Sequence, residues 1–540
     1  MRLRMFLALA ALVAAAAAQL PGVVDTVGGT TFDNQNSGPS LRMLYRDPQF
    51  GIHVAWTFSV QPGGSQWPDR TMYYNFYDYG TGEWNWVEPD YMNSGMNSQT
   101  RRTGYGTIDV DPADGAALVT GHYSAGGMPP EFCPTVQRDL APGSGLFDEC
   151  VGAPTLAGYF LPVVGVDASA NIHLQLVKFQ ASDNLYYSRS TFWCTWDDPE
   201  FWNQSGAYGH NLTASHASEK VLATWMIGND DSTALRYRFS SDAGASWDPV
   251  TELTPYPAYG GDTLTVGARG ASVIFDRDDN WLLVTTLLPV VGDTAYQNPA
   301  QLWMYNSGTA EWRRVRRAES HALAGGLGSH AAICDRPSLG QDPASGRLYC
   351  AWEEFDSTNV EPSTGLLRAD VWLAWSDDGG ANWSQPQLLA PTDETSKRFP
   401  HVGADCSGDS VAVGWVQDVI AGFNVDEVGA VSDNPVCVWH GRVTGIAEQP
   451  GKRVERLGAR PNPFRAGTAI SLQPAGRRPE TVSIYDAAGN LVRVLAVGRD
   501  PSAVVWDGRD GSGREVQPGC YLARWRVGNS LRTGKLVKAR

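Results

Sequence analysis

Short apolar strands separated by Asp-, Gly- and Pro-rich turns recur through residues 19–444. In seven units a polar turn is followed by an apolar strand that often ends in Trp, as in Asp342 to Trp352. The turns begin 48 to 66 residues apart, at Asp47, Asp111, Asp167, Ser215, Asp276, Asp342 and Asp405. Each unit is long enough for the four antiparallel strands of a propeller blade. The pattern predicts an all-β propeller of seven blades, with six as the alternative. The run Val23 to Val27 is expected to supply the strand that closes the ring.

A turn pattern, Ser-x-Asp-x-Gly-x-x-Trp, occurs twice in this region. In such a turn the Asp accepts backbone N–H groups, the Gly supplies a positive φ, and the Trp folds back as an apolar plug. The two copies consist of Ser240, Asp242, Gly244 and Trp247, and of Ser376, Asp378, Gly380 and Trp383. The pattern resembles the Asp-box, or BNR repeat, of sialidase-like β-propellers. That resemblance is specific for the fold, because the Asp-box is a structural turn and is not catalytic.

The chain changes character after Val443. Residues 445–459 read as a polar linker, and residues 460–540 alternate apolar positions with Gly/Asn turns, which predicts a small β-sandwich. Residues 452–540 hold 17 Lys+Arg and 7 Asp+Glu, whereas the whole chain has a net charge of −16. The acidic remainder of the chain argues against nucleic acid as a partner, and the basic residues of 452–540 are interpreted as a solvated surface.

This C-terminal segment is similar to the hook-capping-protein-type Ig-like domain and to the C-terminal sorting domain of the type IX secretion system. The resemblance rests on Pro461-Asn-Pro-Phe464, the turn after Tyr485-Asp486, the hairpin from Trp506 and the strand after Pro518. It implies an Ig-like C-terminal sorting domain that engages export machinery at the outer membrane, with an ordinary Ig-like spacer as the alternative.

The N-terminus has the pattern of a secretory signal peptide. Arg2 and Arg4 precede an apolar run that ends at Ala18, and residues 1–18 are expected to be removed. No other stretch is long and apolar enough to span a bilayer. The mature protein is therefore expected to be secreted or held at the outer cell surface of a bacterium.

Eight cysteines follow the signal peptide, and export makes disulfides plausible. Cys133 and Cys150 flank a Pro/Gly-rich loop, so this pair is the favoured bridge. No Cys or His pair has metal-ligand spacing, and no cofactor is expected. Asp276, Asp278 and Asn280 have the start of a calcium loop but lack its Gly and distant Glu, so a plain turn is favoured over calcium.

A sialidase needs arginines that clamp the substrate carboxylate, an acid, and a Tyr nucleophile activated by Glu. The first blade lacks the R-I-P motif of that family. Arg102, Arg336 and Arg398 are the candidates for a divergent arginine cluster, with Asp335 as a candidate acid. The alternative, that these residues only mark strand starts, is favoured, because Pro recurs at this position. The sequence thus predicts a non-catalytic propeller that binds a glycan or a surface protein, with an exo-sialidase-type glycoside hydrolase as the alternative.

Overall fold

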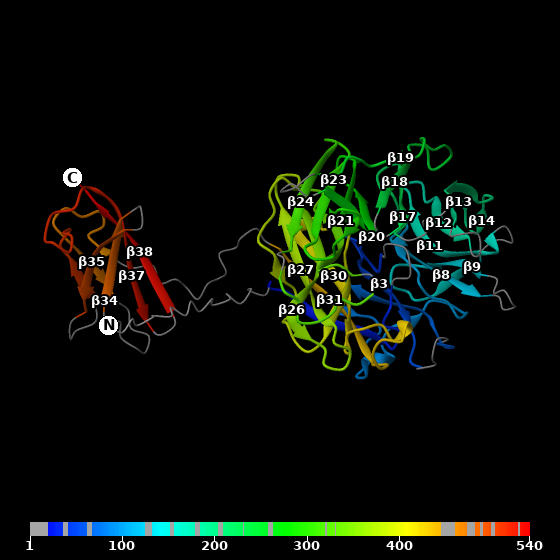
Figure 1. Cartoon of the computed structure of the whole chain (residues 1–540), viewed down its shortest axis with the longest axis horizontal. Coiled ribbons are helices and arrows are strands. Elements are labelled where there is room, and N and C mark those ends of the chain that lie inside the picture. The colour runs from blue at the N-terminus through cyan, green and yellow to red at the C-terminus, as the bar shows by residue number, and fades with distance from the viewer. Residues whose placement is uncertain are drawn as a thin grey trace. The chain divides into compact units, whose positions relative to one another are not determined.

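The computed structural model describes residues 20–35, 42–61, 67–124, 132–151, 156–178, 184–203, 209–229, 232–257, 263–318, 321–329, 331–443, 459–471, 481–486, 490–497, 503–527 and 530–539. The chain forms two compact units, Met1–Val443 and Thr444–Arg540, and each is described by itself (Figure 1). The expected signal peptide and most of the expected linker lie outside the described residues.

The first unit contains seven sheets of four or five antiparallel strands in its described residues. The first sheet contains β2 (Leu44–Arg46), β3 (Gly51–Phe58), β4 (Thr71–Asp78), β5 (Glu83–Trp84) and the side strand β6 (Met96–Asn97), and the second contains β7 (Ile108–Val110), β8 (Ala117–Ser124), β9 (Phe132–Asp139) and β10 (Phe147–Val151). The third sheet contains β11 (Tyr159–Val166), β12 (Ile172–Lys178), β13 (Asn184–Phe192), β14 (Thr195–Trp196) and β15 (Glu200–Asn203). The fourth sheet contains β16 (Asn211–Ala214), β17 (Val221–Asn229), β18 (Ser232–Ser240) and β19 (Thr251–Glu252).

The remaining three sheets follow in chain order. The fifth sheet contains β20 (Thr263–Phe275), β21 (Trp281–Val291), β22 (Thr294–Ala295), β23 (Gln301–Asn306) and β24 (Glu311–Arg317). The sixth sheet contains β25 (Cys334–Gln341), β26 (Leu348–Val360), β27 (Leu367–Ser376) and β28 (Gln387–Leu388). The seventh sheet contains β29 (Ser396–Val402), β30 (Ser410–Asp418), β31 (Asn434–Arg442) and β1 (Val23–Thr30). Short 3-10 turns lie at η2 (Tyr91–Asn93), η4 (Ser407–Asp409) and η5 (Asn424–Asp426).

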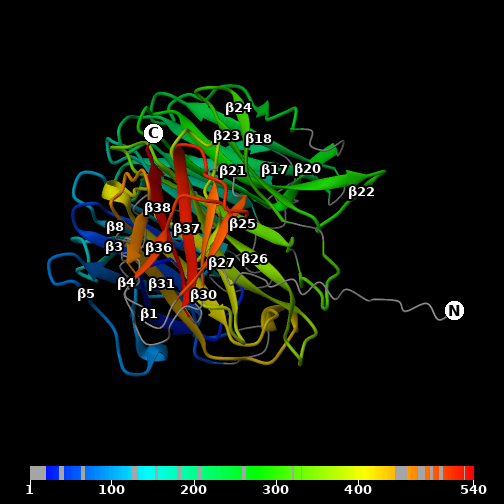
Figure 2. The same ribbon diagram turned by 90° about the vertical axis from the view of Figure 1, so that its left-hand side faces the viewer.

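The innermost strands form a closed ring. Strand β2 contacts β7, and the contacts continue through β11, β16, β20, β25 and β29 back to β2. Strand β1 pairs antiparallel with β31, with Val24 opposite Trp439 and Thr30 opposite Asn434 (Figure 2). The first and last parts of the unit therefore share one sheet, which closes the ring of blades. This confirms the β-propeller with seven blades, closed by the predicted N-terminal strand.

The repeated turn after each inner strand has one physical cause. Its first residue carries a side-chain oxygen that accepts the backbone N–H two residues later. In the first blade Asp47 Oδ1 accepts from Gln49 at 2.7 Å, and in the fourth Ser215 Oγ accepts from Ala217 at 3.1 Å. The same bond forms at Asp111, Asp167, Asp276, Asp342 and Asp405. An early Asp or Ser therefore recurs because it starts the turn to the second strand.

The hydrophobic core is divided among clusters that lie between neighbouring sheets. Between the sixth and seventh sheets, for example, Val371 and Leu373 of β27 pack with Trp415 of β30 and Trp439 of β31. All four of these side chains are fully buried. Both faces of each central strand are covered by adjacent blades, which explains why these strands are almost continuously apolar.

The second unit contains two sheets in its described residues. One contains β32 (Ala459–Arg460), β33 (Thr468–Ser471) and β36 (Ala503–Trp506), and the other β35 (Leu491–Ala496), β34 (Thr481–Asp486), β37 (Gly519–Val527) and β38 (Ser530–Lys538). Trp506 fills the core, with its ring edge-on to Phe464 at 5.3 Å and to Tyr521 at 5.0 Å between centroids. The predicted small C-terminal β-sandwich is confirmed. Among the described residues of the chain, no helix has the length and hydropathy needed to cross a membrane.

Candidate functional site

Two of the three candidate arginines converge on a buried carboxylate of the protein itself. Arg398 donates from Nη2 to Oε1 of Glu353 at 3.1 Å and from Nε to Oε2 at 3.2 Å, and Arg336 Nη1 binds Oε1 as well. The Glu353 side chain is fully buried. Burial raises its pKa, but the two guanidinium groups more than offset this and hold it at about 2. Glu353 therefore remains charged and pairs with both arginines, and Asp335 Oδ2 lies 3.9 Å from Arg336 Nη1 as a second negative charge.

The two inner strands that carry these arginines contain a bulge before proline. The register shifts between Asp335 and Ser338 in β25 and between Arg398 and His401 in β29. Arg336 (φ 49°) and Phe399 (φ 60°) adopt the left-handed conformation immediately before Pro337 and Pro400. A corresponding shift occurs in β11, before Val163. The recurring Pro therefore marks a structural irregularity at the strand start, as the alternative interpretation of the sequence proposed.

The other two candidates have structural contacts of their own. Asp335 Oδ1 accepts from Thr286 Oγ1 at 2.8 Å and from the N–H of Arg336 at 2.9 Å. Arg102 lies between the first and second blades, where its Nε donates to the carbonyl of Trp67 at 2.9 Å. The structure therefore brings Arg336 and Arg398 together on Glu353 and gives Arg102 a different environment.

Two further expectations concern the cysteines and the Asp276 turn. Cys150 forms a disulfide with Cys194, so the predicted Cys133–Cys150 bridge is wrong. Cys194 is 44 residues along the chain, yet the fold brings its Cα to 5.3 Å from that of Cys150, whereas Cys133 is buried in β9. At Asp276, Oδ1 accepts the N–H groups of Asp278 at 2.9 Å and Asn280 at 2.8 Å, which is the geometry of the turn.

The two Ser-x-Asp-x-Gly-x-x-Trp segments adopt the same hydrogen-bonded turn. Ser240 Oγ donates to Asp242 Oδ1 at 2.8 Å and accepts the Gly244 N–H at 2.9 Å, while Asp242 Oδ1 accepts the Ser246 N–H at 2.9 Å. The corresponding distances around Asp378 are 2.9, 2.9 and 2.8 Å. Gly244 (φ 69°) and Gly380 (φ 89°) supply the expected positive φ. Hydrogen bonds from Ser246 are the main reason that the pKa of Asp242 falls to about 2.

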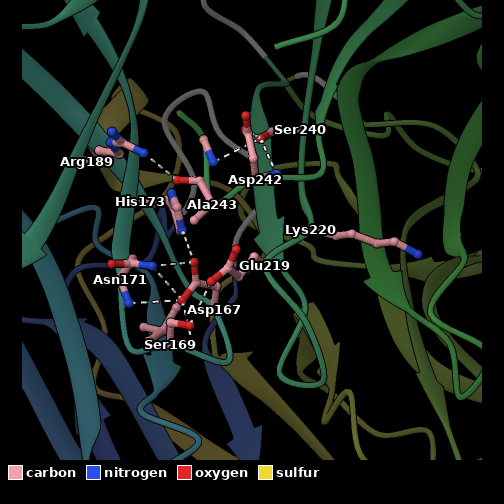
Figure 3. Close-up of polar contacts among 12 residues, drawn as sticks. Asp167, Ser169, Asn171, His173, Arg189, Glu219, Lys220, Ser240, Asp242 and Ala243 are labelled. Atoms are coloured by element: carbon pink, nitrogen blue, oxygen red, sulfur yellow. Dashed lines mark hydrogen bonds and ion pairs between the residues drawn. The ribbon is translucent and has the colours of Figure 1, made fainter. Parts of the chain in front are cut away.

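The turn at Asp242 also joins two blades. Figure 3 shows it beside the Asp167 turn of the third blade, with Arg189 reaching from that blade to the carbonyl of Ala243 at 2.9 Å. Ser169 donates to Glu219 at 3.1 Å across the same boundary. Trp247 packs edge-on against Tyr187 of β13, with ring centroids 4.8 Å apart. This segment therefore links neighbouring blades, as expected of a structural turn.

A polar pocket of about 430 Å³ lies within the ring, where the inner strands of six blades meet. Its ionisable and aromatic lining comprises Arg42, Tyr45, Asp109, His216, Phe275, Asp276, Arg277, His401 and Asp405. The turn residues Ala217, Pro343 and Ala404 also line it, which places its mouth at the end of the ring where the inner strands turn into the second strands. This volume is within the range of ligand-binding pockets. We refer to it as the axial pocket.

A chain of polar contacts crosses the axial pocket. The Tyr45 hydroxyl lies 2.8 Å from His216 Nδ1, His216 Nε2 lies 3.3 Å from Asp109 Oδ1, and Arg42 Nη1 lies 3.0 Å from Asp109 Oδ2. Arg42 also donates from Nη2 to the carbonyl of Leu212 in the fourth blade at 3.0 Å. The first, second and fourth blades are thus joined through one chain, which holds the polar lining in a fixed arrangement.

The pocket fixes the protonation of its buried groups. Burial raises the pKa of the Asp109 carboxyl, but Arg42 and His216 outweigh it and the net pKa is lowered. Burial and the charges of Asp109 and Asp405 raise the pKa of the Tyr45 hydroxyl well above its usual value. Burial, with a smaller contribution from Arg42, lowers the pKa of His401 to about 3, and its Nδ1 is buried without a hydrogen-bond partner. Near neutral pH, Asp109 is therefore charged, whereas Tyr45 and His401 are neutral.

Sequence reasoning did not identify these residues as a site. Arg42 and Tyr45 stand at the start of the first inner strand, where the sequence lacks the R-I-P motif. Asp109 and His216 come from the second and fourth blades, and no spacing between them marks a common site. The available signal was the position of Tyr45, Asp109 and His216 on or just after inner strands, which face the axis of a propeller.

One family model and several solved structures are similar to parts of this chain. Residues 461–525 match the family model of the FlgD Ig-like domain. The structure is similar to that of an ulvan lyase (TM-score 0.46, 10% identity, covering 76% of this chain and 95% of the lyase). It is also similar to the α-L-arabinanase of Penicillium chrysogenum (0.37, 14%, 77% and 98%) and to the phage phi92 endosialidase (0.41, 10%, 96% and 87%). No curated protein sequence matches this chain significantly.

Proposed function

We propose that this protein is an exported propeller that binds a glycan in the axial pocket without cleaving it. The observation that carries this proposal is the polar chain from Tyr45 to Arg42, which lines a preformed pocket of about 430 Å³. Fixed hydroxyl, imidazole and guanidinium groups next to an aromatic ring suit the hydroxyls and the apolar face of a sugar. The buried, unpartnered Nδ1 of His401 adds one further polar group.

The protonation of the pocket supports binding over hydrolysis. A glycosidase needs a carboxylic acid that keeps its proton near neutral pH, usually through a raised pKa. Asp109 has a lowered pKa and is held by Arg42 and His216. Asp405 forms an ion pair with Arg46 at 3.0 Å. Tyr45 has a raised pKa and remains a neutral phenol, which is a poor nucleophile.

We further propose that the C-terminal unit directs export. The match of residues 461–525 to the FlgD Ig-like domain and the signal-peptide pattern of residues 1–18 support this assignment. The geometry of the two Ser-x-Asp-x-Gly-x-x-Trp turns supports the assignment of the propeller to the sialidase-like type with Asp-boxes. In this proposal the propeller is the exported cargo, and the basic C-terminal unit is the sorting domain that the export machinery recognises.

A substitution at the mouth of the pocket tests the binding proposal. Ala217 is exposed and lines the pocket, so Ala217→Trp would block it without disturbing the core. Ala113→Trp is the matched control, because Ala113 is exposed at the corresponding turn position of the second blade and does not line the pocket. Both variants and the unmodified protein would be titrated against a panel of oligosaccharides, with release of reducing ends followed in parallel.

We expect saturable binding of at least one oligosaccharide, a loss of tenfold or more in Ala217→Trp, and unchanged affinity in Ala113→Trp, without new reducing ends. Equal binding by the two variants, or no binding by the unmodified protein, would overturn the assignment of the pocket. Accumulation of reducing ends that Ala217→Trp abolishes would instead establish a hydrolase.

A further inference from the structure

A second polar feature lies at the other end of the propeller, around Arg70. This residue immediately precedes β4, which begins at the end of the first sheet opposite the Asp47 turn. Its Nε donates to the carbonyl of Thr103 at 3.0 Å. Its guanidinium carbon lies 5.3 Å from the centroid of the Phe32 ring and 4.9 Å from that of Tyr105. These contacts hold the planar group in a fixed orientation.

Arg70 differs in its charge balance from the arginines on or next to the inner strands. Arg42, Arg46, Arg336 and Arg398 each form an ion pair with a carboxylate. Among the described residues, Arg70 has no ion pair, and its two Nη nitrogens have no hydrogen-bond partner. Burial, together with the nearby charge of Arg102, lowers the pKa of Arg70 to about 10 although Tyr105 favours the charged form. Arg70 thus carries a charge that no carboxylate among the described residues pairs with.

The surroundings of Arg70 favour an anion. Arg102 contributes a second positive charge close by, and burial lowers its pKa too, although Tyr105 and the carboxylate of Asp69 act in the opposite direction. His122 stacks on Tyr105 at 5.9 Å and remains neutral, because burial and the two arginines lower its pKa well below the usual value. The hydroxyl of Thr103 is buried without a hydrogen-bond partner. This patch therefore presents fixed donors and positive charge next to an aromatic ring.

We propose that Arg70, with Arg102 beside it, binds the carboxylate of an acidic saccharide, and that the partly exposed ring of Tyr105 contacts the sugar. The two Nη groups of a guanidinium match the two oxygens of a carboxylate, which explains the preference for a planar anion. This site is separate from the axial pocket and adds a charge requirement to the ligand.

The test uses trigalacturonate and its fully methyl-esterified form, which share a backbone and differ in charge. Binding of both to the full chain would be measured by calorimetry for the unmodified protein, Arg70→Gln and Arg70→Lys. Arg313→Gln is the control, because Arg313 is a partly exposed arginine of the fifth blade that pairs with Glu311 on the same strand. Thermal unfolding of each variant would verify the fold.

We expect trigalacturonate to bind more tightly than the ester, with an affinity that falls as salt rises. Arg70→Gln should lose about 10- to 100-fold in affinity for the acid, the range for charge-assisted hydrogen bonds, and Arg70→Lys should lose less. Arg313→Gln should bind normally. If Arg70→Gln does not fold, Arg70→Lys tests the proposal instead. This variant lacks the planar guanidinium group, so it should still lose affinity for the acid.

Two results would overturn the inference. One is equal affinity for the acid and the ester. The other is equal affinity of the Arg70 variants and Arg313→Gln for the acid. Ala217→Trp separates this proposal from that for the axial pocket. Acid binding that is lost in Ala217→Trp but kept in Arg70→Gln would place the acid in the axial pocket, refuting the Arg70 site while leaving the proposed function intact.

Discussion

Arg398 and Glu353 form a bidentate ion pair between neighbouring blades, with Nη2 to Oε1 at 3.1 Å and Nε to Oε2 at 3.2 Å. Arg336 binds the same carboxylate from the sixth blade. Glu353 therefore holds both guanidinium groups in place at the boundary between the sixth and seventh blades.

Glu353→Gln should therefore destabilise the propeller strongly. The substitution removes the negative charge that both buried guanidinium groups contact and leaves only the longer Arg336–Asp335 pair at 3.9 Å, which costs about 3–5 kcal/mol of unfolding free energy. Asp114→Asn is the control, because Asp114 pairs with Arg138 at a partly exposed site where such pairs contribute about 0–1 kcal/mol. Urea unfolding of both variants checks the difference, and similar losses would contradict the structural role of Glu353.

The pH dependence of stability should report the same carboxylate. Glu353 has a folded pKa of about 2 against an ordinary value of 4.5. A lowered folded pKa stabilises the protein above the ordinary value, and this contribution is lost as pH falls through the folded pKa. The stability difference between the unmodified protein and Glu353→Gln should thus be constant above about pH 5 and shrink toward pH 2. A difference that stays constant down to pH 2 would refute the lowered pKa.

The disulfide should be found between Cys150 and Cys194. Peptide mapping of the unreduced protein should recover a cross-linked pair with these two residues. Cys194→Ala should cost about 2–5 kcal/mol, because the bridge closes a loop of 44 residues in the unfolded chain. Cys133→Ala should leave the cross-link intact. Recovery of a Cys133–Cys150 peptide would instead support the bridge expected from the sequence.

Ring closure should depend on the N-terminal strand. Removal of residues 19–30 deletes β1 and exposes the edge of β31, which carries the large apolar side chain of Trp439. We expect aggregation and a broadened thermal transition, because an open apolar edge pairs with other chains. Truncation after Val443 is the control, since the C-terminal unit is a separate compact unit. If the two truncations melt alike, the closing strand is not required.

Much of the fold could be predicted because its signals are local. The Asp or Ser of each turn accepts a backbone N–H two residues later, so the turn leaves its mark within a few residues of sequence. Gly244 and Gly380 could be assigned a positive φ for the same reason. The cysteine prediction failed because it used proximity in the chain, whereas the partner of Cys150 lies on the next blade.

The sequence by itself determined the repeated blade, the closing strand, the structural turns at Asp242 and Asp378, and the boundary near Val443, because each depends on contacts within one segment or on a regular period. Only the tertiary structure decided which carboxylate the arginines pair with and which polar groups line the axis. Glu353, Arg336 and Arg398 come from two blades, and Tyr45, Asp109 and His216 from three. These groups contact one another through ion pairs and hydrogen bonds at about 3 Å, a distance that ring closure sets and that no sequence spacing records.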